Sequence, residues 1–235
     1  MSQPSRYLKL PFSFDLTRLR AELTQLEASK WISHFNTNAY ENNWLCLPLR
    51  SVDGRIDHIM PVNEGHFQDT VLLQDCAYMR EVIDFFQCEK TSIRLMSLEA
   101  GGLIKEHRDD ATSLEDGITR LHIPINTTPD VLFRIDGEEV HFSAGDTWYL
   151  NASCLHAVRN PGTQARVHLM LDCVSNAWLE NVFLDAGWVA RPKSKYPDPS
   201  INDGNVLTVI EQLRTAGHAA GVKIADELDA IRLAT

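Results

Sequence analysis

Residues 91–98 read TSIRLMSL, residues 119–126 read TRLHIPIN, and residues 165–173 read ARVHLMLDC. Each stretch is short, mostly apolar and bounded by turn residues, which is typical of a buried strand. Eight such strands at this spacing favour an antiparallel sandwich or barrel, and the jelly roll is a common eight-stranded solution. The predicted strands are Thr91–Leu98, Leu103–His107, Thr119–Asn126, Val131–Ile135, Glu139–Phe142, Thr147–Leu150, Leu155–Arg159 and Ala165–Cys173.

Helical patterns precede the strand region. Residues Asp15–Lys30 carry leucines at helical spacing on one face, and Asp15 is a suitable N-cap. A second helix is expected over about Gln74–Phe86. Between the two helices, Trp44–Leu49 and His58–Met60 are expected to add edge strands.

The pattern turns helical again after Cys173. Helices are predicted at Ala177–Gly187, Val206–Ala216 and Lys223–Leu233, with a proline-rich link over residues 191–200. We therefore expect two parts: a jelly-roll core with N-terminal helices over residues 1–175, and a helical extension over residues 176–235. The extension is long enough to pack on the core or to form a homodimer contact, and the residues do not choose between these roles.

Composition narrows the class of partner and compartment. Lys and Arg number 22 against 32 Asp and Glu, and the net charge of −10 disfavours nucleic acid or an anionic membrane as the main partner. The five cysteines show no C-x-x-C pair, which indicates reduced thiols rather than a disulfide framework. No run of about 18 apolar residues and no signal-peptide pattern is present. These features predict a cytoplasmic protein.

One histidine–carboxylate pattern points to metal chemistry. His107-Arg-Asp109 stands at the end of a predicted strand, and His156 follows 49 residues after His107 at the start of another. Two imidazoles and one carboxylate make up the facial triad of non-haem Fe(II) oxygenases, which leaves positions open for a co-substrate and O₂. The pattern alone is weak, because nine histidines and 32 acidic residues in 235 supply about one H-x-[DE] by chance. A surface histidine beside a solvated acidic turn is the plain alternative.

An arginine in the last apolar strand adds to the pattern. Arg166 lies among Val, Leu and Met, where a charge is costly to bury unless it meets an anion. Its planar fork suits a carboxylate, and the distal carboxylate of 2-oxoglutarate would supply one. A structural ion pair with a neighbouring Asp or Glu is the alternative.

A second charged pair lies on the strand Thr119–Asn126. Alternation places Arg120 and His122 on one face of this strand and Leu121 and Ile123 on the other. If the leucine and isoleucine pack into the core, Arg120 and His122 face the cavity that holds the metal. The alternative is an outward-facing polar edge.

These residues together resemble the aspartyl/asparaginyl β-hydroxylase family of Fe(II)- and 2-oxoglutarate-dependent oxygenases. The resemblance covers about Arg94 to Cys173, roughly a third of the chain, and the bacterial proline cis-hydroxylases are similar over the same region. It is carried by five segments in order: His107-Arg-Asp109, Arg120-Leu-His122-Ile-Pro-Ile, Gly145-Asp-Thr-Trp148, His156-Ala-Val-Arg-Asn160 and Arg166-Val-His-Leu-Met-Leu-Asp172.

The resemblance implies a fold and a set of roles. The core would be a mainly β, double-stranded β-helix (jelly roll, cupin-like), with Fe(II) held by His107, Asp109 and His156. Arg166 would pair with the far carboxylate of 2-oxoglutarate. His122 would contact the co-substrate near the metal, and Arg120 would hold an acidic group of co-substrate or substrate. A serine that helps to bind 2-oxoglutarate in some relatives has no clear match, since Met96 stands nearest by spacing.

The expected function is therefore hydroxylation of an unactivated C–H bond, with release of succinate and CO₂. The substrate would be an amino acid, an Asp or Asn side chain in a peptide, or a related small metabolite. A cupin-like protein that binds a ligand without turnover is one alternative. A zinc-dependent hydrolase is another, although it lacks a general-base Glu near the ligands and leaves Arg166 unexplained.

Overall fold

The computed structural model describes residues 4–60, 62, 64–109, 111–190, 195–198 and 200–234. The chain divides into two compact units, Met1–Ala190 and Arg191–Thr235. They are described in turn.

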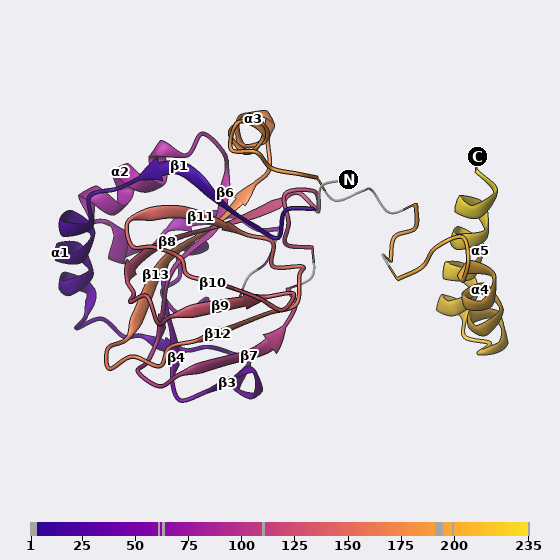
Figure 1. The fold of residues 1–235 in the computed structure, drawn as a ribbon, viewed down its shortest axis with the longest axis horizontal. Helices are drawn as coiled ribbons and strands as arrows, with labels where there is room; N and C mark the ends of the chain where they lie inside the picture. The colour runs from indigo at the N-terminus through magenta and orange to yellow at the C-terminus, as the bar shows by residue number, and fades with distance from the viewer. Residues whose placement is uncertain are drawn as a thin grey trace. The chain divides into compact units, whose positions relative to one another are not determined.

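Two antiparallel sheets form the first unit (Figure 1). The large sheet has the strand order β1-β11-β8-β13-β6-β4-β2, with β5 paired to β4, and the small sheet has the order β10-β9-β12-β7-β3. The strands are β1 (Tyr7–Ser13), β2 (Ile32–Ser33), β3 (Tyr40–Glu41), β4 (Trp44–Val52), β5 (Phe67–Asp69), β6 (Lys90–Leu98), β7 (Leu103–His107), β8 (Ile118–Asn126), β9 (Leu132–Ile135), β10 (Glu138–Val140), β11 (Asp146–Leu150), β12 (His156–Arg159) and β13 (Arg166–Val174).

Helices cover one face of the large sheet. They are α1 (Leu16–Leu26), α2 (Ala77–Phe85) and α3 (Ala177–Asp185), with short 3₁₀ turns at Thr37–Ala39 and Val71–Leu73. Leu121, Ile123 and Leu169 belong to the same buried cluster as the apolar faces of these helices. Since successive strand side chains alternate, Arg120 and His122 face the other way and line a pocket. The prediction that they face a cavity is confirmed.

A second apolar cluster lies between the two sheets. It includes Phe133, Phe142, Leu150 and Val158, and the rings of Phe133 and Phe142 stack with centroids 4.2 Å apart. This packing fills part of the space between the sheets, and the pocket occupies another part. Two facing antiparallel sheets confirm the predicted mainly β jelly roll.

The predicted elements agree closely with the observed ones. All eight strands from Thr91 onward are present, with bounds shifted by two residues at most. Asp15 is the N-cap of α1, and its carboxylate accepts hydrogen bonds from the backbone of Thr17 and Arg18. Strand β1 was not predicted, and it extends the large sheet by pairing with β11. The predicted strand His58–Met60 is wrong, because this segment forms no ladder and the Ile59 carbonyl instead accepts from Arg94.

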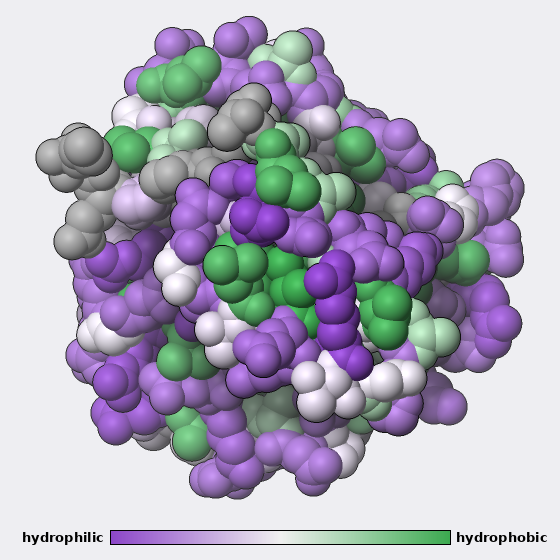
Figure 2. All heavy atoms as spheres, turned by 90° about the vertical axis from the view of Figure 1, so that its right-hand side faces the viewer, coloured by the Kyte–Doolittle hydropathy of each residue, from purple (hydrophilic) through white to green (hydrophobic). Residues whose placement is uncertain are grey.

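The second unit is a pair of helices, α4 (Val206–Thr215) and α5 (Ala219–Leu233). Val206, Ile210 and Leu228 are buried between them, whereas Leu207 and Leu233 are exposed. Figure 2 shows one face of the molecule, on which small groups of apolar side chains lie among polar ones. Within the described residues, no helix combines the length and the apolar character that a membrane span requires.

The observed division of the chain differs from the expected one. The boundary falls after Ala190 instead of after residue 175, because Leu179 and Phe183 of α3 are buried in the core cluster of the first unit. Part of the proline-rich link lies outside the described residues. Packing of the extension on the core, or its use in a homodimer, stays a prediction.

Candidate metal centre and pocket

Strand pairing brings the three predicted metal ligands together. His156, at the start of β12, is directly opposite His107, at the end of β7, in the ladder of the small sheet. Asp109 follows β7, and its backbone N–H donates to the Ala152 carbonyl at 2.9 Å. The ligand atoms of the three side chains all lie within 4.8 Å of one another. Residues 49 positions apart in the chain therefore form one cluster.

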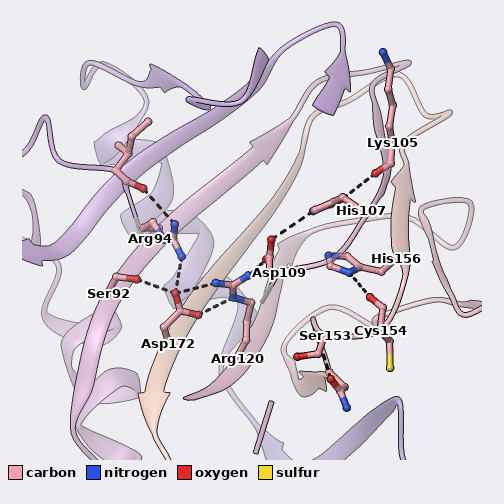
Figure 3. A network of polar contacts seen from close by, with 12 residues as sticks. Ser92, Arg94, Lys105, His107, Asp109, Arg120, Ser153, Cys154, His156 and Asp172 are labelled. Carbon is pink, nitrogen blue, oxygen red and sulfur yellow. Dashed lines mark hydrogen bonds and ion pairs between the residues drawn. The ribbon is translucent and has the colours of Figure 1, made fainter. Parts of the chain in front are cut away.

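Each imidazole is oriented by the backbone carbonyl two residues before it (Figure 3). His107 Nδ1 lies 2.8 Å from the Lys105 carbonyl, and His156 Nδ1 lies 2.9 Å from the Cys154 carbonyl. A carbonyl only accepts, so Nδ1 carries the proton in each ring and Nε2 keeps its lone pair for a metal. Burial, together with the neighbouring His107, lowers the pKa of His156 to about 4, which keeps the ring neutral. The donor set therefore fits a divalent iron ion.

The carboxylate of Asp109 is held by a cation. Oδ1 lies 3.9 Å from His107 Nε2, on the side of the cluster, and Oδ2 accepts from Arg120 Nη1. Burial is the largest single influence and would raise the pKa of this carboxyl, but the charge and hydrogen bond of Arg120, together with the two neighbouring histidines, lower the pKa overall. Asp109 is therefore ionised, as a metal ligand must be.

Arg120 belongs to a buried network that is centred on Asp172. Asp172 accepts from Arg120 Nε at 2.7 Å, from Arg94 Nη2 at 2.6 Å and from Ser92 Oγ at 2.9 Å. Burial opposes the charge of Asp172, yet the two guanidinium groups hold its pKa well below the usual carboxyl range. The network links three strands of the large sheet to the metal cluster (Figure 3).

This network changes the role expected for Arg120. Its Nε and Nη2 donate to Asp172 and its Nη1 donates to Asp109, so the guanidinium is engaged with protein carboxylates. The family resemblance implies that it holds an acidic group of co-substrate or substrate, and that role stays a prediction. We propose that Arg120 positions Asp109, because its Nη1 donates to that carboxylate.

Replacement of Arg120 by lysine is expected to weaken iron binding by roughly 10- to 100-fold, as is typical when a partner of a metal ligand is lost. Lysine keeps the charge but cannot bridge two carboxylates with a planar fork. Iron affinity measured by competition with a chelator tests this. Arg134→Lys, at an exposed position on β9 of the small sheet, is the matched control, and an equal affinity for both variants would contradict the assignment.

The pocket beside the metal cluster has a volume of about 160 Å³ and is lined from both sheets. Arg166 contributes to its wall and is only 3% exposed. Its Nη2 lies 2.9 Å from His168 Nδ1, and its Cζ lies 5.0 Å from the centroid of the Phe133 ring. Within the described part of the chain no carboxylate pairs with Arg166, and burial lowers its pKa to about 9. The structural ion pair that was the alternative for Arg166 is absent from these residues.

Two buried histidines accompany Arg166. His122 and His168 approach each other with their Nδ1 atoms 3.5 Å apart, and the Nε2 atom of each is buried without a partner in the structure. Burial and the charge of Arg166 lower the pKa of both rings well below the ordinary value, so both are neutral. His122 lines the pocket as predicted.

Sequence reasoning missed three features of the pocket. Arg94 lines it from β6 and is buried, and Asp172 holds Arg94 and Arg120 in place. The same argument that selected Arg166, an arginine inside an apolar strand, applies to Arg94. His34 stacks on Trp44 with ring centroids 3.6 Å apart at the rim, and no local pattern marks that contact.

Comparison with known proteins identifies the family of the chain. Residues 13–176 match the aspartyl/asparaginyl beta-hydroxylase family. The chain belongs to this family. The predicted triad, Arg120, His122 and Arg166 all fall within the matched residues of the aspartyl/asparaginyl beta-hydroxylase domain.

The chain is also similar to individual proteins. It is 25% identical over 171 residues to L-proline cis-4-hydroxylase from Rhizobium meliloti (strain 1021), and the match covers 72% of this chain and 60% of that relative. The chain thus spans about three fifths of the length of this relative. Among solved structures, it is similar to a Pseudomonas putida prolyl-4-hydroxylase (11% identity, TM-score 0.47, 73% of this chain and 94% of that one). It is also similar to an oxidoreductase of the 2OG-Fe(II) oxygenase family from Burkholderia pseudomallei (16% identity, TM-score 0.45, 73% and 86%).

Proposed function

We propose that this protein is an Fe(II)- and 2-oxoglutarate-dependent dioxygenase that hydroxylates a C–H bond of a small, carboxylate-bearing substrate and releases succinate and CO₂. The observation that carries the proposal is Arg166. It is a buried guanidinium without a carboxylate partner among the described residues, and it lines the same pocket as the His107–Asp109–His156 cluster. A buried charge of this kind calls for an anionic ligand.

Iron suits the cluster better than a hydrolytic zinc. Glu106, the acidic residue next to His107, pairs with Arg134 at 3.8 Å, and both side chains are about half exposed. Asp172 is engaged by two arginines and is not free to accept a proton from water. A zinc hydrolase needs a free general base beside the metal, and none of the described residues offers one.

The chain's own residues provide the co-substrate site. Arg166 would hold the distal carboxylate with two parallel N–H groups, and His122 would offer a ring nitrogen beside it. Bound Fe(II), together with 2-oxoglutarate and O₂, supplies the oxidising equivalents for C–H hydroxylation. The protein orients the reactants and keeps the Asp109 carboxylate ionised through Arg120. Phe133 and Met170 contribute apolar wall that limits water in the pocket.

Charge balance supports an anionic substrate. Apart from the exposed Arg108, the charged groups of the pocket and its network are Arg94, Arg120 and Arg166 against Asp109 and Asp172, a net charge of +1. Fe(II) adds two positive charges and 2-oxoglutarate adds two negative charges, so an excess of +1 remains. A substrate carboxylate would neutralise it, and Arg94 is the candidate partner, because its Nε is buried without a hydrogen-bond partner in the structure.

The size of the pocket and the relatives favour a free amino acid over a folded protein. A volume of about 160 Å³ fits a small molecule, and one similar protein is named for hydroxylation of L-proline. An Asp or Asn side chain of a short peptide is the second candidate, because the family is named for these residues. We place the reaction in the cytoplasm, where the five free cysteines would stay reduced.

The direct test is anaerobic addition of Fe(II) and then 2-oxoglutarate to metal-free protein. We expect a visible metal-to-ligand charge-transfer band that saturates at one equivalent of each, and no band with Zn(II) in place of Fe(II). Proline, other amino acids and Asp or Asn peptides are then screened for substrate-dependent succinate release. Without a band, the oxygenase assignment fails, and a cupin-like ligand-binding protein becomes the better account.

A further inference from the structure

A second cavity lies on the other side of Arg166. Its volume is about 250 Å³, and it is lined by the β8–β9 turn, the β12–β13 turn and α1. Arg166 borders this cavity as well as the pocket beside the metal cluster. Arg166 is therefore a lining residue of both spaces.

The charge of the second cavity is opposite to that of the chain. Arg20 and Arg166 line it, and no Asp or Glu is among its lining residues. The chain as a whole carries a net charge of −10. Neither arginine has an ion-pair partner among the described residues. Arg6, Arg50 and Arg120, by contrast, each pair with a carboxylate. Local positive charge of this kind attracts a small anion.

Residues that line this cavity have hydrogen-bond donors without partners. Arg166 Nε and Thr127 Oγ1 are buried and have no hydrogen-bond partner in the structure. Among the residues that the structure describes, Arg20 makes hydrogen bonds only through its Nε, which donates to the Ile125 carbonyl at 3.2 Å and to Asn126 Oδ1 at 3.3 Å. Its terminal nitrogens remain available to a ligand. Unsatisfied donors of this kind call for an acceptor that is rich in oxygen.

Arg166 has enough N–H groups to serve both spaces. A guanidinium offers five donors, of which a bidentate carboxylate takes two and His168 takes one. Two remain for the second cavity. We propose that this cavity is a binding site for a small oxyanion, held between Arg20, Thr127 and Arg166. The oxyanion is either tetrahedral, as in phosphate and sulfate, or a carboxylate, as in succinate.

An anion bound at this site is expected to weaken the binding of 2-oxoglutarate. This consequence rests on the proposed function. An anion at the second site places negative charge beside the guanidinium that holds the distal carboxylate of 2-oxoglutarate. The two anions repel each other across Arg166, so each weakens the binding of the other by the same factor. We expect roughly a tenfold increase in the 2-oxoglutarate concentration needed for half-maximal rate.

The first experiment needs neither iron nor 2-oxoglutarate. Sulfate and, separately, succinate are titrated into metal-free protein in a low-chloride buffer and followed by calorimetry. We expect Arg20→Gln to weaken binding of the preferred anion at least tenfold, and Thr127→Val to weaken it to a smaller extent. Arg18→Gln is the matched control, because Arg18 lies on the same helix and pairs with the exposed Glu81, and it should stay within twofold of the native protein. The anion that responds to Arg20→Gln identifies the class of ligand.

The second experiment measures 2-oxoglutarate dependence with and without the anion. The shift should appear in the native protein and in Arg18→Gln and be absent in Arg20→Gln, whose turnover in anion-free buffer stays within twofold. Anion binding that is absent, or equal in the native protein and Arg20→Gln, overturns the site. If Arg20-dependent binding is present but 2-oxoglutarate never binds, the oxyanion site stands and the proposed function fails.

Discussion

Replacement of Asp172 by asparagine is expected to lower the free energy of unfolding by about 3–5 kcal/mol, because it leaves buried arginines without their shared counterion. Asp172 is 3% exposed and receives hydrogen bonds from Arg94, Arg120 and Ser92. Asparagine has the same shape but no charge, and its NH₂ group would face guanidinium donors. Urea denaturation of the metal-free protein measures the change.

The matched control is Asp69→Asn. Asp69 also pairs with an arginine, Arg50, at 2.8 Å, but its side chain is 45% exposed. An exposed pair contributes only about 0–1 kcal/mol. Because the folded-state pKa of Asp172 is lowered, its contribution is present at neutral pH and is lost as the pH falls below the ordinary carboxyl range. Equal destabilisation by the two variants would contradict the central role of Asp172.

Replacement of Arg166 by methionine is expected to have opposite effects with and without the co-substrate. With iron present, the 2-oxoglutarate concentration for half-maximal rate should rise by about 100-fold or more, which corresponds to about 2.8 kcal/mol. Without ligands, the variant should unfold at a higher temperature than the native protein, because an unpaired buried charge is removed. Burial lowers the pKa of Arg166 to about 9, so the cost of its charge is present in full below that pH.

Two measurements check this pair of effects. Initial rates of succinate formation give the co-substrate dependence, and calorimetric scans of metal-free protein give the melting temperature. Arg159→Met, on the exposed face of β12, is the control and should leave both quantities nearly unchanged. A less than threefold change in 2-oxoglutarate dependence would remove Arg166 from the co-substrate site.

The sequence was informative where local pattern determines structure. Alternating residues on β8 correctly predicted that Arg120 and His122 lie on the opposite face from Leu121 and Ile123. The position of Asp109 after a strand and of His156 at the start of another also placed the cluster, since paired strands bring their ends together. An arginine within an apolar strand signalled a buried charge that lacks a carboxylate partner in the described structure.

Local sequence pattern could not predict which strands pair when they are far apart in the chain. The engagement of Arg120 with Asp172 depends on the register between β8 and β13, in which Asp172 is opposite Arg120. Strand β1 has no turn signal that marks it as part of a sheet whose next strand lies more than 130 residues later. The second cavity likewise forms from two turns and a helix that are distant in sequence.

The two sheets divide the residues of the pocket between them. The small sheet and its connecting loop carry His107, Asp109 and His156, whereas the large sheet carries Arg94 and Arg166. Substitutions of Arg94 or Arg166 can therefore alter which molecule is recognised while the proposed metal cluster keeps its ligands, provided that Arg120 and Asp172, which hold Asp109, are retained. Such a separation allows selectivity to diverge among descendants of one ancestor without loss of the shared chemistry. It also indicates where an engineer should direct mutagenesis to change the substrate.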